Sequence, residues 1–162
     1  MRRLVLAVTA IGLLAGLAPL SAAGARAACP AGDRTKVVSA RAGATHLLVP
    51  AGAVSVLICR YSGLRSAAPF RLTRHGLVSD RATVASLARG LDSLRPFVGV
   101  FHCPASTGAA IVAYFRYAAP PDDPVTVALD GCTSAGNGHL TRNAATPAGE
   151  RLLTRLKTLA AA

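Results

Sequence analysis

The chain of 162 residues has no tryptophan and one methionine, and aromatic residues make up only 4% of it. Proteins that bind single-stranded nucleic acid without sequence preference stack the bases on aromatic side chains inside a basic groove. No basic cluster in this sequence is interleaved with aromatic residues. We therefore expect no nucleic-acid partner.

Acidic residues are scarce as well, since the chain has only seven. Glycoside hydrolysis needs a pair of carboxylates across the scissile bond. Asp122 and Asp123 stand between prolines in a predicted turn, and Glu150 falls in the first turn of a predicted helix, where an acid favours the helix dipole. The sequence therefore gives no support to carboxylate catalysis.

Basic residues outnumber acidic ones, and the formal net charge is +11. Sixteen of the 18 basic residues are arginine, and alanine is abundant, as in proteins from GC-rich genomes. The charge has two interpretations that the sequence leaves open. It reflects this compositional bias on a solvated surface, or it attracts an anionic polymer of the cell envelope.

The first 27 residues have the three parts of an export signal. Arg2 and Arg3 form a positive start, residues 4–20 are an apolar run, and Ala25-Arg26-Ala27 offers a small-residue cleavage site before Ala28. We expect a cleaved secretory signal at 1–27 and a single domain at 28–162, with a membrane contact only if the signal is retained. Loss of the signal would leave 15 basic and seven acidic residues, a net charge of +8.

All four cysteines follow the predicted signal, at positions 29, 59, 103 and 132. An even number of cysteines in an exported chain predicts disulfides, here two. The spacings of 30 and 29 residues favour pairing Cys29 with Cys59 and Cys103 with Cys132. No C-x-x-C motif is present, so we expect no metal and no other cofactor.

The periodicity of apolar residues predicts an α+β fold, an antiparallel sheet of about four to six strands with two helices packed on one face. Strands are expected at 45–49, 53–61, 108–118 and 125–130, and 70–78 is expected to be a bent strand or a small hairpin around His75-Gly76. Residues 138–144, "GHLTRNA", are expected to pair back onto 125–130. One helix should begin after Asp80 and end before Pro96, and the other should begin after Thr146.

The stretch "LDGCTSAGNGH", residues 129–139, gathers more chemically active side chains than any other. It does not lead into a helix, so a phosphate-binding loop is not supported, and Asn137-Gly138 instead predicts a tight turn. A hydrolase built on His102, His139 and Asp130, with Ser106 or Ser134 as nucleophile, is the enzymatic alternative. No G-x-S-x-G motif positions either serine, and we expect a non-enzymatic protein.

Several short motifs carry a first resemblance: "LICRY" at 57–61, Cys103-Pro104, Phe115-x-Tyr117, Gly131-Cys132 and Asn137-Gly138. Together they resemble a group of exported two-disulfide proteins from high-GC Gram-positive bacteria. This resemblance covers most of residues 28–162. It implies an exported, disulfide-stabilised domain and no particular activity.

A second, architectural resemblance is to subtilisin-inhibitor-like secreted proteins. These also run strand, helix and then a Cys-Pro segment that is disulfide-linked to a cysteine about thirty residues later. In them the reactive bond follows the Cys-Pro pair, which here would place it at Pro104, Ala105 and Ser106. This chain departs from that family because it has no cysteine between Cys59 and Cys103.

These observations lead to one expected function and one alternative. We expect a secreted or envelope-located, extracytoplasmic domain that binds a protein of the cell exterior or envelope, with an anionic polymer as an additional candidate partner. The alternative is a secreted serine-protease inhibitor that presents residues 103–107. We name these residues, with the sequence Cys-Pro-Ala-Ser-Thr, the CPAST loop.

Overall fold

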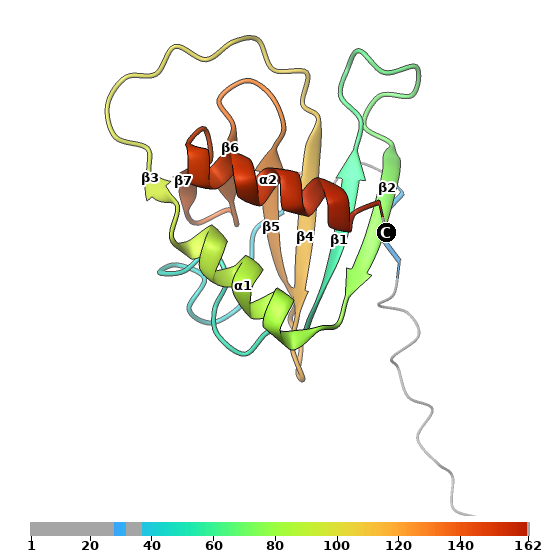
Figure 1. Cartoon of the computed structure of the whole chain (residues 1–162), viewed down its shortest axis with the longest axis vertical. Helices are drawn as coiled ribbons and strands as arrows, with labels where there is room; N and C mark the ends of the chain where they lie inside the picture. Colours follow the sequence, from blue (N-terminus) through green and yellow to red (C-terminus); the bar gives the residue numbers. More distant parts are fainter. Residues whose placement is uncertain (1–27, 32–36, 162) are drawn as a thin grey trace, which may run out of the picture.

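The computed structural model describes residues 28–31 and 37–161, so the predicted export signal lies outside the described residues. One antiparallel sheet runs in the order β2-β1-β4-β5-β6-β7-β3, and both helices cover the same face of it (Figure 1). In chain order the elements are β1 (Ser55–Tyr61), β2 (Leu72–Val78), α1 (Arg81–Asp92), β3 (Arg95–Pro96), β4 (Ala110–Arg116), β5 (Asp123–Ala128), β6 (Ser134–Gly136), β7 (Thr141–Asn143) and α2 (Pro147–Leu159).

The predicted α+β class is confirmed, whereas the predicted number of strands is wrong. The sheet has seven strands instead of four to six. The additional ones include β3, with two residues, and β6, with three. Strands of this length are too short to show an alternation of apolar and polar residues, which is the sequence signal for a strand.

Both helices begin at the predicted caps. The Asp80 carboxylate accepts a hydrogen bond from the Thr83 backbone N–H at 2.8 Å, and the Thr146 hydroxyl accepts one from the Gly149 N–H at 3.1 Å. These caps satisfy N–H groups that have no partner within the helix. The apolar stripes of the two helices pack on the sheet, with these residues fully or almost fully buried: Val84, Leu87, Leu91, Leu153 and Leu156.

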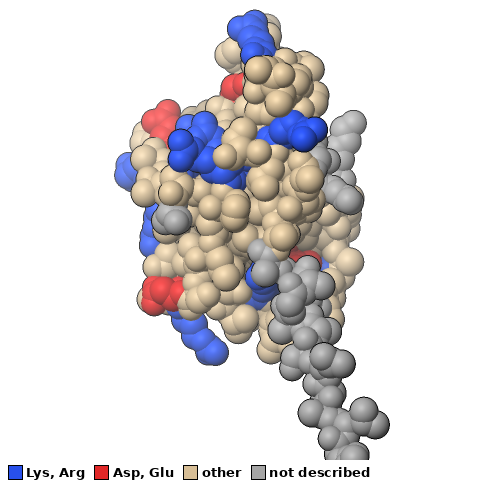
Figure 2. Space-filling model, turned by 90° about the vertical axis from the view of Figure 1, so that its right-hand side faces the viewer, with Lys and Arg blue, Asp and Glu red and all other residues tan. Residues whose placement is uncertain are grey.

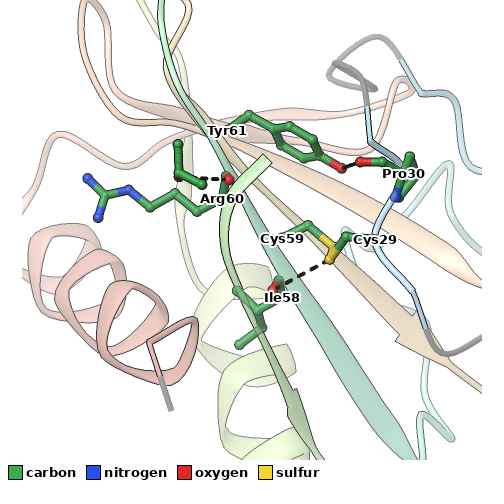
Figure 3. Close-up of a disulfide and its surroundings, with 7 residues drawn as sticks. Cys29, Pro30, Ile58, Cys59, Arg60 and Tyr61 are labelled. Atoms are coloured by element: carbon green, nitrogen blue, oxygen red, sulfur yellow. Dashed lines mark hydrogen bonds between the residues drawn. A yellow bond between two sulfur atoms is a disulfide. The ribbon is translucent and has the colours of Figure 1, made fainter. Parts of the chain in front are cut away.

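The opposite face of the sheet carries a smaller apolar cluster, made of Leu57, Cys59, Tyr61 and Val112. The disulfide between Cys29 and Cys59 holds the N-terminal segment against this face, and the Tyr61 hydroxyl donates to the Pro30 carbonyl at 2.9 Å (Figure 3). The central strands are therefore buried on both sides, which explains the almost continuous apolar run of β1.

Residues 45–49, predicted to be a strand, instead comprise the end of a turn at 42–46 and a bend at 48–49. The Asn137 side chain explains the difference, because its amide donates to the carbonyls of Ala44 at 2.8 Å and Leu47 at 3.0 Å. A carbonyl bonded in this way is not paired in a sheet ladder. Leu48 and Val49 still enter the core from this turn.

Residues 70–78 do not bend into a hairpin at His75-Gly76, because β2 passes straight through both. The glycine is required for a different reason. A Cβ at position 76 would lie 2.0 Å from the Leu159 carbonyl oxygen, so only glycine lets the end of α2 approach the strand this closely.

The predicted pairing of residues 138–144 with 125–130 is also wrong. Strand β7 pairs with β6, and β6 lies between β7 and β5. The turn between β6 and β7 does use Asn137-Gly138, but only Gly138 has a positive φ, of 90°. Asn137 is fully buried and acts through its side chain.

No helix in the described part of the chain is both long enough and apolar enough to cross a bilayer.

We expect Asn137→Ala to destabilise the protein by about 2–4 kcal/mol, since it leaves buried backbone groups without their partners. The Asn137 amide donates to the 44–48 turn, and its oxygen accepts from the backbone N–H groups of His139 and Leu140. Urea denaturation measures the effect. The matched control is Asn143→Ala, because the Asn143 oxygen accepts a single exposed hydrogen bond, from the Ala145 N–H. Equal losses in the two variants would contradict the role of Asn137.

Candidate functional site: the CPAST loop

The CPAST loop belongs to the irregular segment that connects β3 to β4 over the upper end of the sheet (Figure 1). Residues 103–106 are exposed and Thr107 is half-buried. The loop lies over the end of the central strands, where β4 begins and β5 ends. The segment that follows β5 can therefore contact the loop and hold it in place.

The first anchor of the loop is a disulfide. Cys103 is bonded to Cys132, three residues after Leu129, and their Cα atoms lie 4.9 Å apart. Both disulfides have the pairing that the cysteine spacing favours, and no described cysteine is free.

The second anchor is the carboxylate of Asp130. It accepts hydrogen bonds from the Ser106 hydroxyl at 2.7 Å, from the Thr107 backbone N–H at 3.1 Å and from the Thr107 hydroxyl. The Ser106 oxygen in turn accepts from the Gly108 N–H at 3.1 Å. The side chains of Ser106 and Thr107 are thus directed down onto the protein.

The charge state of Asp130 follows from these bonds. Partial burial by itself would raise the pKa of Asp130, but the hydrogen bonds from Thr107 and Ser106 together outweigh it, and the pKa lies below its ordinary value of 3.8. Asp130 is therefore ionised at neutral pH. Hydrogen bonds to an ionised acceptor are stronger than neutral ones, which suits a bracing role.

A third anchor comes from the β1–β2 loop. The Leu64 backbone N–H donates to the Thr107 carbonyl at 2.8 Å. Gly63 lies directly against Thr107, since a Cβ at position 63 would be 2.2 Å from the Thr107 hydroxyl oxygen. Pro104 and Ala105 stand between the anchors, exposed and held at both ends.

Exposed apolar side chains precede the CPAST loop in the same connection. Val98 is 81% exposed and Val100 is 91% exposed. The Phe101 ring, 42% exposed, packs edge-on against that of Phe97 with 4.8 Å between ring centres. Covering such apolar side chains with a partner surface removes them from water, which is favourable, and patches of this kind mark interaction sites.

The residues of the hydrolase hypothesis are not brought together. Ser106 bonds to Asp130, but His139 lies in the β6–β7 turn at the opposite end of the strands, where its ring nitrogen Nε2 lies 2.8 Å from the Ser39 carbonyl oxygen. His102 is exposed and makes no hydrogen bond to Ser106 or Asp130. The described part of the chain therefore does not contain this arrangement of nucleophile, base and acid.

The described residues contain no group of three or more His, Cys, Asp and Glu side chains that could hold a metal ion. The comparisons with known proteins identify no relative either: no family model, no curated protein and no solved structure matches this chain.

The bond from Asp130 to the CPAST loop was not predicted from the sequence, where Asp130 is a candidate only for the hydrolase. One signal could have found it. Asp130 lies two residues before Cys132, and Ser106 and Thr107 lie three and four residues after Cys103. Once the two cysteines are paired, these side chains have to be neighbours.

A second carboxyl, that of Asp123, lies fully buried at the other end of β5. Burial raises the pKa of Asp123 to about 6, and the nearby charge of Asp92 adds to the effect. The Ser39 hydroxyl, the Arg41 guanidinium and His139 act in the opposite direction without reversing it. This group belongs to the core and not to the candidate site.

We expect Asp130→Asn to loosen the CPAST loop, because an amide accepts the three hydrogen bonds less strongly than a carboxylate and loses the charge. The expected loss of stability is about 1–2 kcal/mol, since the site is partly solvated. In the native protein this contribution is present at neutral pH and is lost as the pH falls below 3.8. Amide hydrogen exchange at Thr107 and Gly108 measures the loosening, and Glu150→Gln is the control for charge removal. Unchanged exchange would show that Asp130 does not hold the loop.

We expect Asp123→Asn to stabilise the protein at pH 7. A carboxyl whose pKa is about 6 in the native state and 3.8 otherwise costs stability as the pH rises from about 4 to about 6. The amide removes this cost, which is about 1–3 kcal/mol. Melting temperatures between pH 4 and pH 8 test this. The melting temperature of the unchanged protein should fall as the pH rises through this range. The fall should vanish in Asp123→Asn and persist in Asp122→Asn. A fall that persists in both variants would refute the assignment to Asp123.

Proposed function

We propose that this protein is an exported, non-enzymatic binding domain, and that it recognises a protein of the cell exterior or envelope through the CPAST loop. The observation that carries the proposal is the way in which Pro104 and Ala105 are presented. They are exposed, with a disulfide on one side and the Asp130 hydrogen bonds on the other. A loop held in one conformation loses less entropy when it binds, so a larger part of its contact energy becomes affinity.

The surroundings of the loop support recognition of a protein surface. The exposed side chains of Val98, Val100 and Phe101 provide an apolar contact area beside it. Two disulfides in a small domain are consistent with an oxidising, extracytoplasmic compartment.

Inhibition of a serine protease is a second candidate, favoured by one specific feature. Anchors stand on both sides of the Ala105–Ser106 bond: the Cys103–Cys132 disulfide before it, and the bonds of Ser106 and Thr107 to Asp130 after it. A protease that cut this bond would leave both new ends held in place, which favours religation over release. The position agrees with the resemblance to subtilisin-inhibitor-like proteins.

The test uses the oxidised protein as bait for culture supernatant and cell-wall extract. We expect a protein that is retained by the unchanged bait and by Ala82→Arg, a control on the exposed side of α1, and lost with Ala105→Arg. An arginine at position 105 blocks the loop surface without removing any of its anchors. Retention of the same protein by Ala105→Arg would overturn the assignment of the loop.

Titration against subtilisin tests the second candidate. An inhibitor would act stoichiometrically and be cut slowly at Ala105–Ser106. Absence of inhibition at equimolar protein, with or without cleavage, would exclude subtilisin as a target and leave the binding domain as the proposal.

A further inference from the structure

The β1–β2 hairpin carries a strong positive charge that the CPAST loop does not use. Residues 53–79 contain no acidic residue and four arginines: Arg60, Arg65, Arg71 and Arg74. In the described part of the chain, no guanidinium of these four makes a hydrogen bond or an ion pair. Figure 2 shows the Lys and Arg side chains gathered at and just below the tip of this hairpin.

Two of the four arginines are placed against each other. In the register of the sheet Arg60 lies directly opposite Arg74, so their side chains leave the same face of neighbouring strands. Like charges in this position repel and cost stability, because the Cβ atoms of such a pair are only about 5 Å apart. The hairpin itself contains no acidic residue that could offset that repulsion.

The side chain of Arg60 extends away from the disulfide face. Cys59 and Tyr61 point toward Cys29 and Pro30, and Arg60 points to the other side of β1 (Figure 3). There Arg60 and Arg74 line a surface hollow of about 340 Å³ together with Ser62, Gly63, Thr73 and Ala109. Arg60 is half-buried in it, so part of its solvation is already lost.

We propose that this hollow, the Arg60/Arg74 site, binds a phosphate group of an anionic polymer. A tetrahedral phosphate presents enough acceptor oxygens for two guanidinium groups at once, whereas one guanidinium already occupies both oxygens of a carboxylate. A bound dianion also removes the repulsion between the two arginines. Arg65 and Arg71 lie between β1 and β2 in the same hairpin, and we expect them to contact further charged groups of a polymer.

The proposal goes beyond the proposed function and does not depend on it. The CPAST loop is braced by Asp130 and the Cys103–Cys132 disulfide, and no arginine of the hairpin contributes a side-chain bond to it. Loss of phosphate binding would therefore leave recognition by the CPAST loop intact, and the reverse also holds.

The first experiment measures thermal unfolding of the whole oxidised protein in sodium phosphate and in sodium chloride of equal ionic strength. We expect phosphate to raise the melting temperature, because a ligand that binds only the native state stabilises it. The rise should disappear in Arg60→Gln and in Arg74→Gln and persist in Arg89→Gln, an arginine on α1. Equal melting temperatures in the two salts, or equal loss in Arg89→Gln, would overturn the site.

The stability of the same variants in the absence of phosphate distinguishes a ligand site from a structural arginine pair. In low-salt chloride, Arg74→Gln should be at least as stable as the unchanged protein, because it removes one of two repelling charges. A large loss of stability in this variant would show that the arginine pair is structural, and the proposal would fall.

Titration calorimetry with inorganic polyphosphate separates a polymer from a free ion. We expect Arg60→Gln and Arg74→Gln to weaken polyphosphate binding about tenfold or more, the effect of losing a charge-assisted hydrogen bond. The double variant Arg65→Gln/Arg71→Gln should weaken polyphosphate binding and leave unchanged the rise in melting temperature that free phosphate causes. Polyglutamate that binds as tightly as polyphosphate would refute phosphate selectivity. A double variant that loses affinity for polyphosphate but still responds to free phosphate would confirm a polymer ligand.

Discussion

The pairing of β1 with β4 is the contact on which the rest of the structure depends. All seven residues of β1 pair with β4 in an unbroken register, from Ser55 opposite Arg116 to Tyr61 opposite Ala110. Because side chains alternate along a strand, this register sends Val56 and Ile58 toward the helices, and Leu57, Cys59 and Tyr61 toward the N-terminal segment. A slip by one residue would exchange the two cores and break the contact between Cys29 and Cys59.

The same register places the two surfaces for which functions are proposed. The residue before β4 and the end of β5 meet at one edge of the sheet, so Asp130 and Cys132 lie under the CPAST loop. The end of β1 reaches the same end of the sheet, which brings Gly63 and Leu64 against Thr107. The pairing of β1 with β2 sets Arg60 opposite Arg74 there. The braced loop and the basic hollow are therefore neighbours, while the buried Asp123 and the Asn137 amide lie at the other end of the strands.

Prediction from sequence succeeded where the signal is local. The helix caps Asp80 and Thr146 bond to groups three residues away, and the strand predicted at 108–118 is present as β4. It failed where a distant residue decides. The 45–49 segment has the composition of a strand, but the amide of Asn137, 90 residues after Leu47, donates to the carbonyls of Leu47 and Leu48. Gly76 looks like a turn signal and is instead required by the end of α2.

The sequence by itself determined the α+β class and the two helices, because caps and periodicity are properties of neighbouring residues, and its cysteine spacing favoured the disulfide pairing that the structure has. Only the tertiary structure decided that Asp130 braces Ser106 and Thr107, that His139 lies far from them, and that Arg60 faces Arg74. These facts depend on strand register and strand order. Both are set by burial on two faces of a sheet at once, which no local pattern records.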